Sequence, residues 1–190
     1  WALQMTYYTA LRGLGLDVAI VDPHSDLSNY NVVLAPALNM VDDALAKHLS
    51  NYVKQGGQLV IGPRSGFKTL TNRVHAPAPG PLTELMGVNI FRVDALRPGY
   101  KEYVKHTNKG LKTLVYTTWA DLLTPTTARV LATYESGAYK NVAAVTEQKH
   151  SKGFCVTIGM WLDVEGLKVL LEPVFKRAKI ETIKLPEGVR

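Results

Sequence analysis

The chain has 190 residues, of which 46% are hydrophobic and 20% are charged. This length and composition are typical of one well-buried globular domain. No stretch approaches the ~20 consecutive apolar residues that a membrane-spanning helix needs, so the sequence predicts neither such a helix nor a membrane partner.

The formal net charge is +6 and the sequence pI is about 9.4, which is compatible with a nucleic-acid or acidic partner. The basic residues are scattered, however, and the densest group lies in a polar stretch around residues 108–110 that is typical of a hairpin tip. This group consists of Lys101, Lys105, Lys109 and Lys112. Because no RNA-binding, zinc-finger or basic-helix motif accompanies these lysines, we predict no nucleic-acid partner.

The first third of the chain alternates helical and strand-like segments. Apolar residues at helical spacing predict helices over 1–14 and 42–55, the second with Asp42 or Asp43 at its start. Short apolar runs predict strands over 16–21, 31–35 and 59–61. Continuous apolar strands between helices indicate a sheet that is covered on both faces. The predicted fold class is therefore α/β, a three-layer sandwich with a mostly parallel central sheet flanked by helices.

The rest of the chain predicts a proline-rich loop over 67–81, a short helix over 81–86, a strand over 88–93 and a β-excursion over 100–116. A helical turn is expected over 119–123 because a proline follows it. Three strands follow over 128–134, 142–146 and 154–158, and an amphipathic helix over 163–179 closes the domain.

The segment after the predicted strand 59–61 has the spacing of a nucleophile elbow, with Gly62 and Gly66 flanking Arg64. An elbow holds its central residue on a strained strand-to-helix turn, and small flanking residues let the backbone fold that sharply. A working elbow carries Ser or Cys at its centre, and the neighbouring Ser65 is one residue out of register. We therefore predict a degenerate elbow and no catalytic residue in this chain.

Metal and cofactor sites are not predicted either. The five histidines are dispersed without metal-ligand spacing, and the glycines do not form a phosphate-binding loop. The single cysteine, Cys155, excludes an internal disulfide and lies in an apolar run, so we expect it to be a small buried hydrophobe.

Motifs spread over nearly the whole chain resemble the middle domain of glycoside hydrolase family 42 β-galactosidases. They are Tyr30-x-x-Val33-x-Ala35-Pro36, Tyr52-Val53-x-x-Gly56-Gly57-x-Leu59-Val60, Arg64-Ser65-Gly66, Gly80-Pro81-Leu82-x-Glu84-Leu85-x-Gly87-Val88, Trp119-Ala-Asp-Leu122, Val130-Leu-Ala-x-Tyr134, Ala144-Val-Thr146 and Leu185-Pro-x-Gly-Val189.

This resemblance implies a class I glutamine amidotransferase-like (flavodoxin-like) fold and a role in trimerisation. It implies that residues 1–184 form the trimerisation domain and that residues 185–190 begin a linker to a missing C-terminal β-domain. Separately, because the first residue is Trp1 and not Met, we expect the chain to start at a cut. The implied partners are further copies in a homotrimer and a catalytic barrel in the parent protein. The parent would be a β-galactosidase of carbohydrate metabolism. The family's two catalytic glutamates lie in that barrel, so no catalytic residue is assigned in this chain. For the location of the protein, the cytoplasm is favoured.

Two alternatives stay open at this stage. The chain could instead be an amidotransferase-like small-molecule module in which Arg64 clamps a carboxylate or phosphate, although a structural ion pair is the favoured interpretation of Arg64. The loop over 67–81 and the excursion over 100–116 are candidate self-association surfaces, but they could also be ordinary surface connections.

Overall fold

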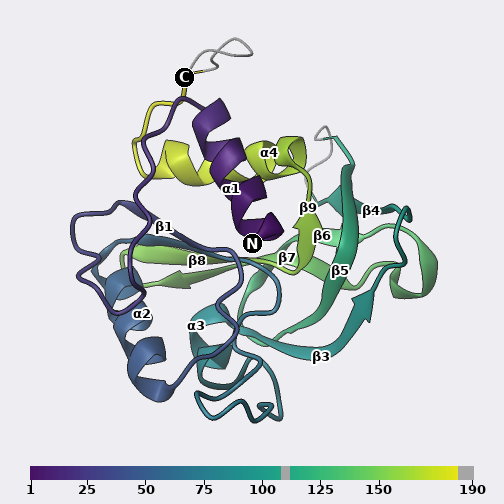
Figure 1. Ribbon diagram of the computed structural model, residues 1–190, viewed down its shortest axis with the longest axis horizontal. Coiled ribbons are helices and arrows are strands. Elements are labelled where there is room, and N and C mark those ends of the chain that lie inside the picture. Colours follow the sequence, from purple (N-terminus) through teal and green to yellow (C-terminus); the bar gives the residue numbers. More distant parts are fainter. Residues whose placement is uncertain (108–111, 184–190) are drawn as a thin grey trace.

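The computed structural model describes residues 1–107 and 112–183. Four α-helices, two short 3₁₀ helices (Gly80–Leu82 and Gly137–Tyr139) and one mixed sheet form in the described part of the chain (Figure 1). The α-helices are α1 (Ala2–Gly13), α2 (Asp43–Gln55), α3 (Thr83–Met86) and α4 (Val164–Arg177). The strands are β1 (Val32–Ala35), β2 (Gln58–Ile61), β3 (Val88–Ala95), β4 (Glu102–His106), β5 (Leu114–Pro125), β6 (Arg129–Tyr134), β7 (Ala143–His150), β8 (Gly153–Ile158) and β9 (Met160–Leu162).

One half of the sheet is parallel, with β1 beside β2 and β2 beside β8. Helices α1 and α4 cover one face of this half, and α2 and α3 cover the other (Figure 1). Side chains alternate accordingly: Val60 of β2 packs toward α1 and α4, whereas Leu59 and Ile61 pack toward α2 and α3. Burial on both faces explains why β2 is apolar from Leu59 to Ile61, and all four of its residues are buried.

The other half of the sheet is antiparallel. From β8 the order continues through β7, β6, β4 and β5 to β3, and the twelve-residue β5 also contacts β7 and β9. Within the described residues, two of the nine strand pairs are parallel and seven are antiparallel. The expected mostly parallel sheet is therefore wrong, and the sheet is mixed. The reason is that β7 and β8 are joined by a tight hairpin, which forces them to run in opposite directions.

Two predicted elements do not form as expected. Residues 16–21 are extended but pair with no strand of the described chain, and Ile20 is 86% exposed. The residues expected to form a helical turn, 119–123, instead belong to β5. A bulge lies between Thr117 and Ala120, where Thr118 adopts a φ of 64°, and this irregularity interrupts the alternation that marks a strand in the sequence.

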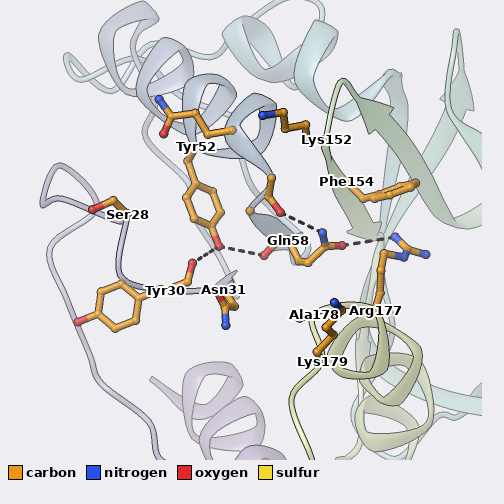
Figure 2. A pocket seen from close by; sticks show the side chains of 13 residues that line it. Ser28, Tyr30, Asn31, Tyr52, Gln58, Lys152, Phe154, Arg177, Ala178 and Lys179 are labelled. Carbon is orange, nitrogen blue, oxygen red and sulfur yellow. Dashed lines mark hydrogen bonds between the residues drawn. The ribbon is translucent and has the colours of Figure 1, made fainter.

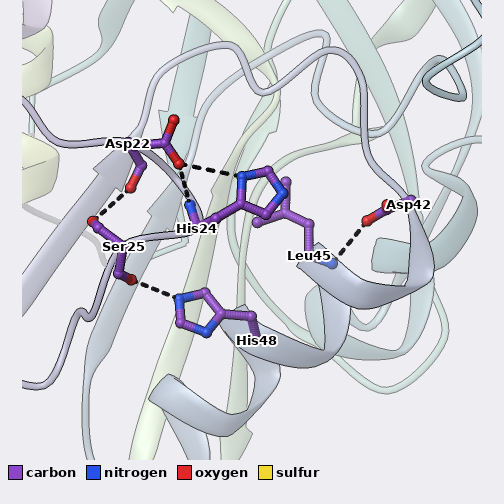
Figure 3. A network of polar contacts seen from close by, with 6 residues as sticks. All are labelled: Asp22, His24, Ser25, Asp42, Leu45 and His48. Carbon is purple, nitrogen blue, oxygen red and sulfur yellow. Dashed lines mark hydrogen bonds and ion pairs between the residues drawn. The ribbon is translucent and has the colours of Figure 1, made fainter.

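The other expected helices and strands are present with ends shifted by a few residues. Asp42 is the N-cap of α2, as the acidic start of that segment predicts, and its carboxylate accepts a hydrogen bond from Leu45 N at 2.8 Å (Figure 3). No helix among the described residues combines the length and the apolar character needed to cross a bilayer. The 100–116 excursion is described in part, as β4 and the start of β5, while its predicted tip around 108–110 and the predicted linker over 185–190 lie outside the described residues.

Candidate functional site

The turn that follows β2 has the tight geometry that the glycine spacing predicts. A side chain at Gly62 would place its Cβ 2.2 Å from the carbonyl oxygen of Pro36, so only glycine fits without a backbone shift. At Gly66, φ is 69° and a Cβ would lie 2.2 Å from the Pro79 carbonyl oxygen. Both glycines are therefore required by the close approach of neighbouring loops, the one after β1 at Gly62 and the one before α3 at Gly66.

Arg64, at the centre of the turn, is held in a strained conformation. Its φ is 63°, a left-handed value that non-glycine residues adopt at a cost in free energy. Two long-range hydrogen bonds hold it there: Arg64 N donates to Oδ2 of Asp121 at 2.8 Å, and Nδ2 of Asn39 donates to the Arg64 carbonyl at 3.0 Å. The conformation is thus fixed by the surrounding loops and not by the turn alone.

The hydroxyl of Ser65 braces the turn from inside. Ser65 is 1% exposed, and its Oγ accepts a hydrogen bond from Leu38 N and donates one to the Gly62 carbonyl, both at 2.9 Å. These contacts join the loop after β1 to the loop after β2. The hydroxyl's two bonds to backbone groups account for its burial and give it a structural part in the turn.

The Arg64 guanidinium lies over the indole ring of Trp119, with Cζ 4.5 Å from the ring centroid. This is the geometry of a cation–π contact. Among residues 1–107 and 112–183, no ion pair joins Arg64 to a carboxylate. The structural ion pair expected of Arg64 does not form among the described residues, and its guanidinium is stacked on an aromatic ring.

Asp121 anchors this arrangement and was missed by the sequence analysis. Its carboxylate is 2% exposed and accepts hydrogen bonds from Arg64 N and, at 2.7 Å, from Nε1 of Trp119. Burial raises the pKa of Asp121 to about 6, although both hydrogen bonds and the nearby Arg64 charge act in the opposite direction. The available signal was the Trp119-x-Asp121 spacing, which places both polar groups on one side of a strand.

A cleft of about 480 Å³ lies at the opposite, amino-terminal edge of the parallel strands. Figure 2 shows Lys152 on one side of it and Arg177 with Lys179 on the other, with Gln58 between them. The Arg177 guanidinium stacks on the Phe154 ring, with its Cζ 3.8 Å from the ring centroid.

Several of the polar groups around this cleft are bonded to the protein itself. The Tyr52 hydroxyl donates to the Tyr30 carbonyl at 2.9 Å, and Gln58 Nε2 donates to the Gly56 carbonyl at 3.2 Å. The buried Glu147, at the next cleft along the edge, forms ion pairs with both Arg177 and Arg129. The Glu147 pairs tie α4 to β6 and β7, and the Arg177–Phe154 stack ties α4 to β8. The Tyr52 bond ties α2 to the loop before β1, so the cleft is a structural junction.

Three of the histidines contact backbone carbonyls, and the five do not gather at one place in the described chain. His48 contacts the Ser25 carbonyl at 3.0 Å, and His24 pairs with Asp22 at 3.2 Å (Figure 3). His75 and His150 contact the carbonyls of residues 41 and 85 in the same way. Each of these contacts ties a loop or strand end to its neighbour.

The described residues form neither a cluster that could bind a metal ion nor an exposed, reactive thiol. Across the described ranges, no three His, Cys, Asp or Glu side chains are placed to hold a metal ion. Cys155 is fully buried, and this burial raises the pKa of its thiol to about 12. The prediction of a buried, hydrophobic cysteine is confirmed.

The fold and the turn together define a mixed α/β domain whose elbow-like turn is braced by backbone hydrogen bonds and presents an arginine. Residues 2–181 match the family model described as the β-galactosidase trimerisation domain, and the chain belongs to this family.

The similarity to known proteins extends over the whole domain. The chain is 32% identical over 201 residues to a β-galactosidase of Halorubrum lacusprofundi, a match that covers 100% of this chain and 29% of the relative. It is 33% identical over 180 residues to a β-galactosidase of Lactobacillus acidophilus, covering 94% of this chain and 26% of that protein.

The solved structure of the polyextremophilic β-galactosidase from Halorubrum lacusprofundi superposes with a TM-score of 0.94 at 33% identity, covering 100% of this chain and 28% of that one. The chain therefore spans less than a third of the length of the curated relatives that it matches.

Proposed function

We propose that this chain is the non-catalytic trimerisation domain of a β-galactosidase that cleaves sugars as a homotrimer. The observation that carries the proposal is the match of residues 2–181 to the trimerisation-domain family, supported by similarity over the full chain to β-galactosidases. Catalysis would reside in a barrel that is part of the same parent protein, and this domain would hold the copies together.

The finer parts of the proposal rest on the sequence resemblance. They are a domain over residues 1–184 followed by a linker over 185–190, and a glutamine amidotransferase-like fold. In that fold Gly62, Arg64 and Gly66 form a degenerate nucleophile elbow. The geometry of the turn supports the last point, because Arg64 has the strained φ of an elbow centre while the hydroxyl of Ser65 bonds to backbone groups. A cytoplasmic location is also proposed, in keeping with a single buried cysteine.

The alternative of a small-molecule module with an anion at Arg64 has no support from the comparisons. The guanidinium lies on the Trp119 ring, and the cleft of about 480 Å³ lies at the other edge of the sheet. We therefore retain self-association as the proposed function.

Two measurements test this proposal. Light scattering on the complete polypeptide that carries this sequence should give three times the mass of one chain. An aryl-galactoside assay should detect hydrolysis by the complete polypeptide and none by the 190-residue chain. Galactoside hydrolysis by the 190-residue chain alone, or a complete polypeptide of single-chain mass, would contradict the proposal.

A further inference from the structure

The loops that follow β1 and β2 are joined into one continuous surface. Met40 and Lys68 form a parallel bridge, Lys68 and Val74 form an antiparallel bridge, and the Asn39 side chain bonds to the Arg64 carbonyl. Both loops leave the carboxyl ends of parallel strands, so they lie at the same edge of the sheet. We call the surface formed by Met40, Arg64, Leu70, Val74 and Trp119 the carboxyl-edge surface.

Large apolar side chains on this surface are exposed. Met40 is 47% exposed, Leu70 58% and Val74 69%. Arg64 is also exposed, and it lies on the half-buried Trp119. Apolar side chains that gather on neighbouring loops, around a polar group, are typical of a surface that contacts another protein.

Two residues with a strained backbone belong to or adjoin the same surface. Arg64 has a φ of 63°, and Thr118, next to Trp119, has a φ of 64°, which is an outlier for a β-branched residue. Such strain persists only where the surroundings enforce it, and it clusters at functional sites. The enforcing group is Asp121, which bonds to both members of the Arg64–Trp119 pair.

The strained pair consists of the residue types that dominate binding energy at protein interfaces. Arg and Trp are enriched among interface hot spots, and a side chain that is already held in place loses little freedom on binding. The two best-defined clefts of the described residues are lined by other residues, so the carboxyl-edge surface is suited to a protein partner and not to an enclosed small molecule.

We propose that the carboxyl-edge surface is the contact through which this domain binds a second copy of its parent chain, with the Arg64–Trp119 pair at the centre of that contact. This inference rests on the proposed function, since it names the surface that brings the copies together. The conformational cost of presenting Arg64 is then recovered only in the assembly.

The decisive variant is Arg64→Gly in the complete polypeptide. Glycine adopts a φ of 63° without strain, so the fold is kept while the guanidinium is lost. Lys179→Gly is the matched control, because Lys179 is an exposed cation with a φ of 57° at the opposite edge of the sheet. Both variants remove one positive charge and relieve one left-handed residue.

Sedimentation equilibrium over a range of concentrations measures the outcome. We expect Arg64→Gly to raise the dissociation constant of the assembly by about 30-fold or more, the effect of losing a hot-spot residue, while Lys179→Gly leaves it unchanged. Equal dissociation constants for Arg64→Gly, Lys179→Gly and the unaltered protein would overturn the inference and leave the proposed function standing. An unaltered protein that sediments as a single chain would overturn both.

A second variant keeps the test open if Arg64→Gly does not fold. The double substitution Leu70→Glu and Val74→Glu changes two exposed side chains and adds two negative charges to the carboxyl-edge surface. We expect it to dissociate the assembly to single chains. An assembly that keeps the unaltered dissociation constant would again overturn the inference.

Discussion

The two edges of the parallel strands each carry an arginine on an aromatic ring, but they use it differently. At the amino-terminal edge, Arg177 lies on Phe154 and also pairs with the buried Glu147. At the carboxyl edge, Arg64 lies on Trp119, while the nearby buried carboxylate, Asp121, accepts the backbone N–H of Arg64. The first arginine is used within the fold, whereas the second is held in place with its guanidinium directed to the surface.

This difference shows how a turn of enzyme-like shape can serve another purpose. The hydrogen bonds that hold the turn come from Ser65, Asn39 and Asp121, and they fix a strained backbone at the turn. Glycine would adopt the same φ without strain, so the arginine is kept there at a cost in free energy. The carboxyl edge therefore has the features of a contact surface, and the amino-terminal edge those of a structural junction.

The largest expected effect concerns the pH dependence of stability. The pKa of Asp121 is raised in the folded state, to about 6 from 3.8, so its favourable contribution is complete below about pH 4 and is lost as the pH rises through 6. The loss amounts to about 3 kcal/mol. Urea unfolding of the unaltered chain and of Asp121→Asn should show their difference in unfolding free energy changing by about this amount between pH 4 and pH 7. A difference that is constant with pH would contradict this description of Asp121.

A loss of stability of similar size is expected when a side chain is added in the turn that follows β2. Gly62→Ala places a Cβ against the Pro36 carbonyl and should lower the free energy of unfolding by about 3 kcal/mol. Gly99→Ala is the control, because nothing lies within 4 Å of a Cβ there, and its positive φ costs only about 1 kcal/mol. Equal losses in chemical denaturation would show that the turn is not tightly packed.

At the amino-terminal edge, the prediction concerns Glu147, which is 6% exposed and is shared by two arginines. Glu147→Gln should lower the free energy of unfolding by about 2 kcal/mol, because two charge-assisted hydrogen bonds are weakened in a buried position. The exposed pair of Glu165 with Lys168 supplies the control, and Glu165→Gln should cost less than about 0.5 kcal/mol. If the two variants unfold at the same urea concentration, the amino-terminal edge is not the junction described here.

The smallest effect should have the opposite sign. Arg64→Gly in the 190-residue chain should raise the free energy of unfolding by about 0.5 kcal/mol, since relief of the left-handed strain exceeds the entropy that glycine adds to the unfolded chain. We expect the thermal unfolding midpoint of Arg64→Gly to be about one or two degrees higher than that of the unaltered chain. A clear loss of stability would show that Arg64 serves the monomer.

The parallel half of the fold could be predicted from local sequence patterns. Helical spacing, the cap at Asp42 and the short apolar strands each depend on residues close together in the chain. Strand direction in the other half depends on which distant segments pair. The bulge at Thr118 interrupts the side-chain alternation of β5, so the sequence pattern indicated a helical turn there. Residues 16–21 have the pattern of a strand but no partner among the described residues, which local patterns cannot reveal.

The candidate site was predictable to the same limited extent. The glycine spacing located the turn and its central arginine, because a close backbone approach or a left-handed backbone favours glycine at that position in the sequence. Asp121 lies 57 residues away from Arg64 along the chain, so only the folded structure brings the two together. The stacking of Arg64 on Trp119 follows from the same long-range contact.

Native mass spectrometry of the complete polypeptide tests the central claim most directly. If this domain joins copies of its parent, the spectrum at micromolar concentration should be dominated by an ion series of three chains. A spectrum that contains only single chains under the same conditions would contradict it.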